Sequence, residues 1–217
     1  MAGLRELLRG LEVFTGELPV FDVQDAPETP EALFTDWLLG AVRAGVPAPH
    51  AMTLSTAGAD GRPSARVLIL KNADERGWQF ASHAASAKGR DLAERPYAAL
   101  TFFWQPLARQ VRLRGPVEPE PAERGAADFL ARGPGARAEA LLGRQSQVLD
   151  SPATRDAAVR RSLARLEREP DAVAPDWTLY TLRPGTVEFW QGDHGRGHTR
   201  LRYSRTPDGW AKELLWP

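Results

Sequence analysis

The sequence predicts a mostly β protein, an antiparallel barrel with peripheral helices. About six to eight short runs either alternate between apolar and polar residues or are apolar throughout, as strands are. Turn sequences rich in Gly, Asp, Asn and Pro separate several neighbouring runs, which indicates hairpins. Helical stretches do not follow every strand, as a parallel α/β sheet would require. Together these observations favour an antiparallel barrel.

The N-terminal part of the chain is predicted to be a helix followed by an irregular arm. Residues 3–12 place their leucines on one helical stripe, and residues 15–28 show no regular pattern. We therefore divide the chain into an N-terminal arm and helix, residues 1–28, and a single domain, residues 29–217.

A longer helix is expected to begin after this arm. Thr29 is a suitable N-cap, and Pro30 is a suitable first helical residue. Its apolar stripe consists of Leu33, Phe34, Trp37, Leu38 and Val42. The helix is expected to end at Gly45.

The strongest strand patterns lie in the middle of the chain. The predicted strands there are residues 51–56, 65–71, 78–81, 97–104 and 109–117. In the last of them, Gln110, Arg112 and Arg114 share one face. Val111 and Leu113 occupy the opposite face, which we expect to belong to the core.

Further helices and strands complete the chain. Ser86 caps a predicted helix that ends at Pro96. Residues 120–145 have a helical pattern that becomes irregular, and residues 154–169 form a charged helix. The remaining predicted strands are residues 177–182, 187–191, 201–203 and 209–217.

The most distinctive stretch is the predicted hairpin of residues 187–203. An aromatic run ends at Gln191, and a loop without hydrophobic residues follows it. Arg196, His198 and Arg200 would lie on one side of this loop if it is extended. Such a cluster suits an anionic or electron-rich ligand, and a solvated hairpin tip would have the same composition.

The composition excludes several classes of function. The chain has 28 Lys and Arg and 28 Asp and Glu, so bulk attraction to nucleic acid or to an anionic membrane is not expected. The absence of cysteine excludes disulfides and thiolate metal sites, and it fits a cytoplasmic protein. No apolar run is long enough for a membrane span, and the N-terminus lacks the apolar core of a signal peptide.

Common catalytic motifs are also absent. The chain has no Gly-x-Ser-x-Gly elbow, Walker loop, His-Glu-x-x-His or Gly-x-Gly-x-x-Gly sequence. His194 and His198 lie beside Asp193, but no further ligand set nearby completes a metal site, so no metal is predicted. What remains is a set of basic and amide groups at strand ends and helix starts. Together they would suit a phosphorylated, partly flat small molecule.

Several motifs share their order and spacing with a known family. They are Arg66-Val-Leu-Ile-Leu-Lys71, Ser86-Ala-Lys-Gly-Arg-Asp-Leu92, Phe103-Trp104, Arg109-Gln110-Val111, Arg144-Gln-Ser146, and Glu188-Phe-Trp-Gln-Gly192 followed by Arg196-Gly-His198-Thr-Arg200. Over most of its length, the chain resembles the pyridoxamine/pyridoxine 5′-phosphate oxidase family. The resemblance implies an FMN-binding split β-barrel, antiparallel and of the Greek-key type. It also implies a homodimer with FMN at the subunit interface.

The resemblance implies roles for individual residues. The FMN contacts would be Arg66, Lys71, Ser82, Lys88, Gln110, Gln145, Ser146, Trp190 and Arg200. Arg196 and His198 would be the catalytic residues, and they would bind the substrate at the carbon that loses hydride. Lys71 and Arg132 would hold the phosphate of the substrate.

Some positions depart from the family pattern. The family's phosphate-binding tyrosine is Asp128 in this chain, and its serine is Ala136. A carboxylate at that position would repel a substrate phosphate. Near the FMN site, Ala81 and Ala87 replace a tyrosine and an arginine. We therefore expect the FMN site to be largely kept and the substrate phosphate site to be weakened.

The expected function is that of an FMN-dependent oxidase in pyridoxal phosphate biosynthesis. Hydride would pass from pyridoxamine or pyridoxine 5′-phosphate to flavin N5, and O₂, the expected electron acceptor, would reoxidise the flavin and give H₂O₂. Two alternatives stay open. One is an FMN-dependent oxidase of a reduced aromatic such as a dihydrophenazine precursor, as in the related phenazine-biosynthesis oxidases. The other is a non-catalytic flavin-binding protein.

Overall fold

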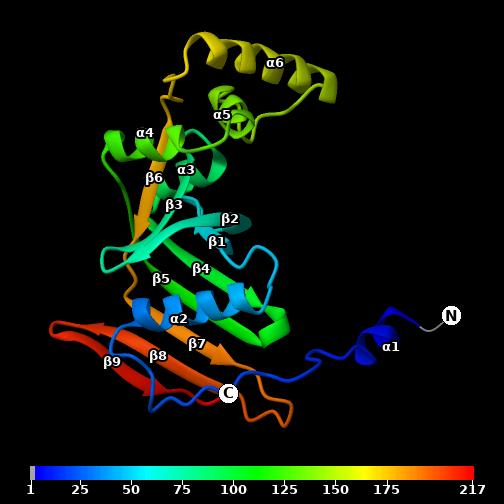
Figure 1. The fold of residues 1–217 in the computed structure, drawn as a ribbon, viewed down its shortest axis with the longest axis vertical. Helices are drawn as coiled ribbons and strands as arrows, with labels where there is room; N and C mark the ends of the chain where they lie inside the picture. The colour runs from blue at the N-terminus through cyan, green and yellow to red at the C-terminus, as the bar shows by residue number, and fades with distance from the viewer. Residues whose placement is uncertain (1–2) are drawn as a thin grey trace. The chain divides into compact units, whose positions relative to one another are not determined.

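The computed structural model describes residues 3–217 and divides the chain into two compact units (Figure 1). The first unit consists of the chain up to His50 together with Thr101–Arg112 and Thr186–Pro217. The second consists of Ala51–Leu100 and Leu113–Gly185. Each unit has its own strands and helices.

The second unit is built on an antiparallel sheet. Its strands are β1 (Ala51–Ala57), β2 (Pro63–Asp74), β3 (Gly77–His83), β6 (Trp177–Leu182) and the second half of β5 (Arg109–Pro119), in the order β1-β2-β3-β6-β5. Leu54 of β1 pairs with Arg66 of β2. The register of β2 against β3 shifts between Leu70 and Asn72, which marks a bulge. Bulges redirect side chains, and Lys71, a predicted site residue, lies in this one.

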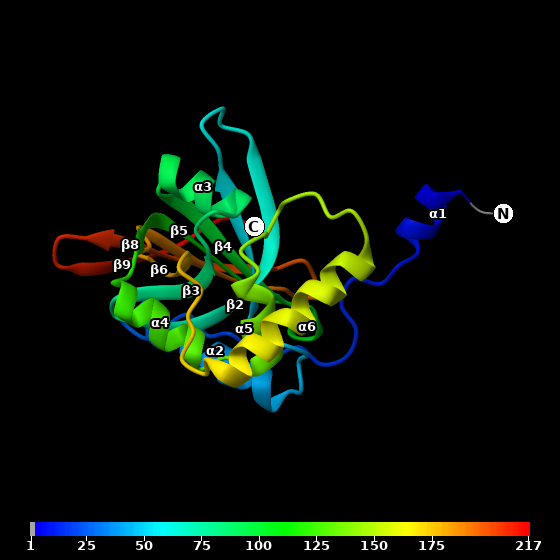
Figure 2. The same cartoon turned by 90° about the horizontal axis from the view of Figure 1, so that it is seen from above.

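The helices of the second unit lie beside these strands. They are α3 (Ala87–Glu94), α4 (Ala122–Leu130), α5 (Pro134–Leu141) and α6 (Pro152–Arg168). α5 and α6 pack side by side (Figure 2), and Ser162 Oγ donates to the carbonyl of Ala138 at 2.9 Å. α4 packs on β6, where a Cβ added to Gly125 would lie 3.1 Å from the Trp177 carbonyl oxygen. Glycine at this position therefore allows the close approach of helix and strand.

The first unit joins the N-terminal helices to the C-terminal strands. Its elements are α1 (Leu4–Arg9), α2 (Pro30–Arg43), a short 3-10 helix (Gln105–Leu107), and the strands β7 (Thr186–Gln191), β8 (Thr199–Thr206) and β9 (Gly209–Leu214), with the strand order β5-β7-β8-β9. β4 (Tyr97–Trp104) and β5 pair with each other, and both run through the two units. The rings of Phe34 and Phe102 lie 4.9 Å apart, and those of Trp37 and Phe189 lie 5.2 Å apart, edge to face. These aromatic contacts form the core between α2 and the strands of the first unit.

Most predicted elements are present, with small shifts of their ends. Every predicted strand is found: residues 3–217 contain nine strands, one for each of the nine predicted ranges, although the overall estimate was about six to eight. Val111 and Leu113 are buried, as predicted. The prediction was wrong for the second half of residues 120–145, which forms the regular helix α5. Gly133 is the N-cap of that helix, and Pro134 at its first position starts it.

Two predicted apolar helix faces are less buried than expected. The leucines of α1 are exposed, and this helix projects away from its own strands in both views (Figures 1 and 2). In α2, Val42 is exposed and Ala41 is buried, so the buried stripe is shifted by one residue at the end of the helix. Within residues 3–217, no helix combines the length and the apolar character that a membrane span needs.

Candidate functional site

The N-terminus of α3 brings several predicted site residues together in the second unit. Ser86 is fully buried, and its Oγ caps the helix by accepting a first-turn backbone N–H at 3.3 Å. Lys88 Nζ donates to the same oxygen at 3.2 Å, and Ser82 Oγ lies 3.4 Å from it. The backbone N–H of Ala87 donates to Ser146 Oγ at 3.4 Å. The helix start thus gathers Ser82, Lys88 and Ser146, which are separated in the sequence.

Lys88 is a buried cation next to a second cation. It is 5% exposed, and burial together with the charge of Arg66 lowers its pKa to about 8. Arg66 donates to Thr56 Oγ1 and to Ser64 Oγ at 2.7 Å each and lies 3.9 Å from the Asp91 carboxylate. Burial lowers the pKa of Arg66, and Asp91 acts in the opposite direction. Two neighbouring cations beside a helix N-terminus are suited to a multiply charged anion such as a phosphate.

A cavity of about 710 Å³ lies in the same unit. Its apolar wall consists of Val67, Leu68, Ile69, Leu142, Val148 and Leu149. The predicted site residues that line it are Lys71, Ser82, Arg132 and Gln145. Apolar walls with a few polar groups are typical of pockets for small organic ligands. Because Ser82 belongs to both, the cavity adjoins the cluster at the start of α3.

Asp128 faces the predicted phosphate-binding residue Lys71. Its Oδ1 lies 3.1 Å from Lys71 Nζ, and its Oδ2 accepts the indole N–H of Trp177 at 2.9 Å. The Asp128 side chain is 14% exposed. The carboxylate therefore points to the residues of the cavity wall rather than to solvent. The other departure at the predicted substrate phosphate site, Ala136, lies exposed on α5.

Arg132 is held in the cavity wall by an aromatic ring. Its guanidinium carbon lies 4.0 Å from the centre of the Trp177 ring. Burial lowers the pKa of Arg132, and the nearby Asp128 opposes this. Nη1 of Arg132 is buried and has no hydrogen-bond partner among residues 3–217. A buried donor without a partner in a cavity wall is suited to a ligand oxygen.

His83, which was not among the predicted site residues, also lines this cavity. It is 4% exposed, and its Nδ1 has no hydrogen-bond partner within the described part of the chain. The Asp176 carboxylate lies 4.0 Å from Nδ1. The signal available in the sequence was its position directly after Ser82 in a predicted strand-to-helix connection.

The loop between β7 and β8 carries the other predicted residues, in the first unit. The backbone N–H of Asp193 donates to His198 Nδ1 at 3.0 Å, and the Asp193 carboxylate accepts the N–H of Gly197 at 3.1 Å. The loop therefore turns at residues 193–197 and is not extended. The condition under which Arg196 and His198 were expected to share one side of the loop is not met. The His198 ring lies 5.0 Å from the Trp190 ring.

Two predicted site residues have left-handed backbone conformations. The φ angle is 66° at Arg196 and 72° at Ser146. Among residues 3–217, only Ala48 and Ala108 share this conformation outside glycine. Such conformations cost about 1–3 kcal/mol each and are concentrated at functional sites.

Arg200 donates hydrogen bonds to residues of its own unit. Its Nε donates to Glu188 at 3.0 Å, and its Nη1 donates to the carbonyl of Trp216 at 2.8 Å. Arg112 donates to the other Glu188 oxygen at 2.7 Å. Burial disfavours the charge of Glu188, but the hydrogen bonds from Arg200 and Arg112 outweigh it and lower the pKa of Glu188. Glu188 thus fixes the direction of the Arg200 guanidinium.

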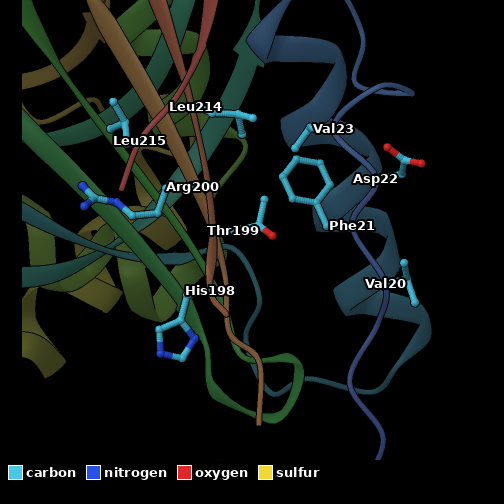
Figure 3. A pocket seen from close by; sticks show the side chains of 9 residues that line it. All are labelled: Val20, Phe21, Asp22, Val23, His198, Thr199, Arg200, Leu214 and Leu215. Carbon is cyan, nitrogen blue, oxygen red and sulfur yellow. The ribbon is translucent and has the colours of Figure 1, made fainter. Parts of the chain in front are cut away.

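A second pocket, of about 480 Å³, lies beside this loop (Figure 3). It is lined by Val20–Val23 of the N-terminal arm together with His198, Thr199, Arg200, Leu214 and Leu215. Figure 3 shows His198 and Arg200 projecting to one side of the chain and Thr199 to the other. The alternation expected for the loop therefore holds for these two residues.

The predicted site residues fall into two groups. The second unit contains Arg66, Lys71, Ser82, Lys88, Arg132, Gln145 and Ser146. The first unit contains Gln110, Trp190, Arg196, His198 and Arg200. Residues 3–217 contain no group of three or more His, Cys, Asp or Glu side chains arranged to hold a metal ion.

Comparison with known proteins identifies the relatives of this chain. Residues 38–191 match the family described as pyridoxamine 5′-phosphate oxidase, and residues 177–217 match the pyridoxine 5′-phosphate oxidase C-terminal dimerisation region. A pyridoxine/pyridoxamine 5′-phosphate oxidase from Burkholderia multivorans is 45% identical over 199 residues, which cover 90% of this chain and 92% of the relative. One from Thermosynechococcus vestitus is 43% identical over 196 residues, which cover 89% and 91%.

Two solved structures are similar to this chain. PhzG from Burkholderia lata, in complex with tetrahydrophenazine-1-carboxylic acid, has a TM-score of 0.86 at 31% identity and covers 93% of this chain and 100% of its own. A pyridoxamine 5′-phosphate oxidase-related, FMN-binding protein from Nostoc punctiforme has a TM-score of 0.67 at 19% identity, covering 87% and 98%. The second likeness confirms the predicted fold class, an antiparallel split barrel with peripheral helices. With a family match over most of its length and relatives of this identity, the chain belongs to the pyridoxine/pyridoxamine 5′-phosphate oxidase family.

Proposed function

We propose that this chain is an FMN-dependent oxidase of pyridoxine and pyridoxamine 5′-phosphate or of compounds closely related to them. Relatives of that name, 45% and 43% identical over 90% and 89% of the chain, support the proposal. The observation that carries it is the pair of cations at the start of α3, the buried Lys88 and the half-buried Arg66 of β2, whose charges a phosphate would neutralise. When bound, FMN supplies a ring that takes hydride at N5 and passes the electrons to O₂, giving H₂O₂.

The cluster at α3 would hold the phosphate of FMN. Arg66, Lys88 and the hydroxyls of Ser82 and Ser146 provide cations and donors, of which Lys88 and Ser82 are buried. A phosphate beside Lys88 would raise the pKa that burial lowers, so Lys88 would be fully charged in the loaded protein. The remaining proposed contacts to FMN are Lys71, Gln110, Gln145, Trp190 and Arg200.

Arg196 and His198 are the proposed catalytic residues. Because His198 Nδ1 accepts the N–H of Asp193, the neutral ring carries its hydrogen on Nε2. That N–H can donate to an oxygen or nitrogen of the substrate and orient it. Arg196 is exposed on the loop and can contact an electron-rich ring substituent. Lys71 and Arg132 are the proposed cations for the far end of the substrate.

We further propose that the protein is a homodimer. The match of residues 177–217 to a dimerisation region supports this. Exposed apolar side chains on β2 and at the C-terminus, Val67, Ile69, Leu214 and Trp216, provide surface for a partner subunit. A cytoplasmic location and a single FMN-binding domain over residues 29–217 stay predictions.

A reduced aromatic such as a dihydrophenazine precursor is the second candidate substrate. The likeness to PhzG, whose solved complex holds tetrahydrophenazine-1-carboxylic acid, favours it. The ion pair between Asp128 and Lys71 also favours it, because an unphosphorylated substrate needs no second phosphate site.

An absorbance spectrum of the purified protein tests the proposal. We expect flavin bands that bleach when pyridoxine 5′-phosphate is added without oxygen, and H₂O₂ equal to the product once air is admitted. Bands that persist with every B6 compound would direct the search to reduced aromatics. A protein that shows no flavin band after FMN is supplied would contradict the cofactor assignment.

Replacing His198 by alanine distinguishes an enzyme from a non-catalytic flavin-binding protein. Loss of the Nε2–H donor is expected to lower kcat about 100-fold or more. FMN affinity, measured by flavin fluorescence, is expected to stay within about threefold. His194→Ala is the matched control, because His194 Nε2 contacts the backbone carbonyl of Gly16. Equal turnover in the two variants would argue against the role of His198.

A further inference from the structure

An ion pair in the cavity wall of the second unit bears on the substrates that the pocket accepts. Lys71 Nζ lies 3.1 Å from Asp128 Oδ1, and the side chains are 31% and 14% exposed. The second Asp128 oxygen accepts the Trp177 indole N–H at 2.9 Å. With both oxygens engaged, the carboxylate is fixed between two residues that line the cavity.

We propose that Asp128 is a specificity-determining residue that removes the preference of the pocket for a phosphate group, so that unphosphorylated pyridoxine and pyridoxamine bind at least as well as their 5′-phosphates. The inference rests on the proposed function and deepens it by naming the substrate class. It concerns the substrate end of the cavity, at Lys71 and Arg132, and not the cluster at α3.

The charge of this part of the wall is too small for a phosphate dianion. Lys71 and Arg132 contribute two positive charges, and Asp128 removes one of them. A phosphate monoester carries between one and two negative charges near neutral pH and would lie beside the fixed carboxylate. The low exposure of Asp128 keeps water from screening that repulsion fully.

The same wall places no electrostatic penalty on a neutral hydroxymethyl group. Such a group carries no charge, so the Asp128 carboxylate beside Lys71 does not repel it. Its oxygen can accept a hydrogen bond from Lys71, which lines the cavity and whose side chain is 31% exposed. The wall therefore suits a neutral hydroxyl better than a phosphate dianion.

The other charged residues that line the cavity do not restore a positive charge. Arg144 and Arg155 are balanced by Glu139 and Asp150, and all four are exposed. Arg155 also pairs with the neighbouring Asp156 at 3.0 Å. Exposed charges of this kind contribute little to binding. The preference at the substrate end thus depends on Lys71, Arg132 and Asp128.

Binding of two matched ligands to the FMN-loaded protein tests the inference. 4-Deoxypyridoxine 5′-phosphate and 4-deoxypyridoxine differ only in the phosphate and lack the group that is oxidised, so turnover does not interfere. In the wild-type protein, the dissociation constant of the phosphorylated ligand is expected to equal or exceed that of the other. Fluorescence titration measures both constants.

Asp128→Asn removes the charge and keeps an oxygen that can accept the Trp177 N–H. We expect it to tighten binding of the phosphorylated ligand at least about tenfold and to change binding of the other by about twofold or less. Asp74→Asn is the matched control, since Asp74 pairs with Arg76 at 2.7 Å and neither residue lines the cavity. Its ratio of the two constants should equal that of the wild type.

Three results would overturn the inference: a wild-type protein that binds the phosphorylated ligand more tightly than the other, an Asp128→Asn variant with an unchanged ratio, or a wild-type protein that binds neither ligand. If thermal unfolding shows that Asp128→Asn does not fold, Asp128→Ser replaces it as a smaller neutral residue. Failure of the proposed function would give a different result. Bound flavin would then stay oxidised with every B6 compound, while the ratio of the two dissociation constants could still be measured.

Discussion

Replacing Lys88 by methionine is expected to stabilise the flavin-free protein and to weaken FMN binding. Lys88 is 5% exposed, and its pKa falls from 10.5 to about 8 because burial and the charge of Arg66 disfavour protonation. At 1.36 kcal/mol per pKa unit, this shift corresponds to about 3 kcal/mol of destabilisation at pH 7. Methionine keeps most of the buried aliphatic chain and has no charge to desolvate.

The pH dependence separates this charge effect from a packing effect. Between about pH 8 and 10.5, Lys88 is deprotonated in the folded protein and protonated in the unfolded chain. The unfolded chain then binds more protons, so the contribution of this group to the free energy of unfolding rises with pH. The destabilisation is therefore complete below about pH 8 and fades towards pH 10.5. The advantage of Lys88→Met should shrink over the same range.

FMN binding should change in the opposite direction. A hydrogen bond to a charged group contributes about 1.5–3 kcal/mol, so its loss should raise the dissociation constant of FMN about 10-fold to 150-fold. Flavin fluorescence at pH 7 measures this constant, and urea denaturation of the flavin-free proteins measures stability. Arg90→Met is the matched control, because Arg90 is an exposed cation on the same helix. It should change neither quantity by much.

The outcome that would refute this reasoning combines both measurements. It is a Lys88→Met protein that is less stable than the wild type without FMN and that binds FMN with unchanged affinity. Lys88 would then be a packing residue, and the phosphate of any cofactor would have to bind elsewhere.

Two further predictions concern the supports of the site residues. Ser86→Ala removes the cap of α3 and the hydroxyl that accepts from Lys88, so urea denaturation should show a free energy of unfolding lower by about 1–2 kcal/mol. Glu188→Gln removes a carboxylate whose pKa is lowered by Arg200 and Arg112 despite its burial. Its stabilisation is present above the pKa of an unfolded glutamate and is lost as the pH falls through the lowered value. In a urea series towards acid pH, the variant should therefore lose less stability than the wild type.

The strands could be predicted because their signal is local. In β5, Val111 and Leu113 alternate with polar residues, and burial follows that alternation. The start of α3 was equally local, since a serine before a helical run is a standard cap and Ser86 acts as one. Ser146 was different, because only the resemblance to the family connected this residue with α3.

The contacts of Asp128 and the shape of the β7–β8 loop could not be predicted in this way. The direction of Asp128 depends on how α4 packs on β6, where Gly125 allows a close approach, and on the bulge that contains Lys71. The placement of Arg196, His198 and Arg200 on one side required an extended loop, but Asp193 accepts the N–H of Gly197 and turns the chain. Both features result from long-range or side-chain hydrogen bonds, which have no periodic signature in the sequence.

The second unit contains two cationic sites that differ in how closely a carboxylate approaches the cations. At α3, Lys88 and Arg66 lie close enough to lower the pKa of Lys88, and the nearest carboxylate, that of Asp91, is 3.9 Å from Arg66. In the cavity wall, the carboxylate of Asp128 lies 3.1 Å from Lys71 and neutralises it. The charge of Arg132 remains in the cavity wall, but at α3 neither Lys88 nor Arg66 has, within residues 3–217, a carboxylate as close as Asp128 is to Lys71. If both sites were built for phosphates, the second would be expected to lack an internal carboxylate, so its presence supports the proposal that Asp128 reduces the preference for a phosphorylated substrate.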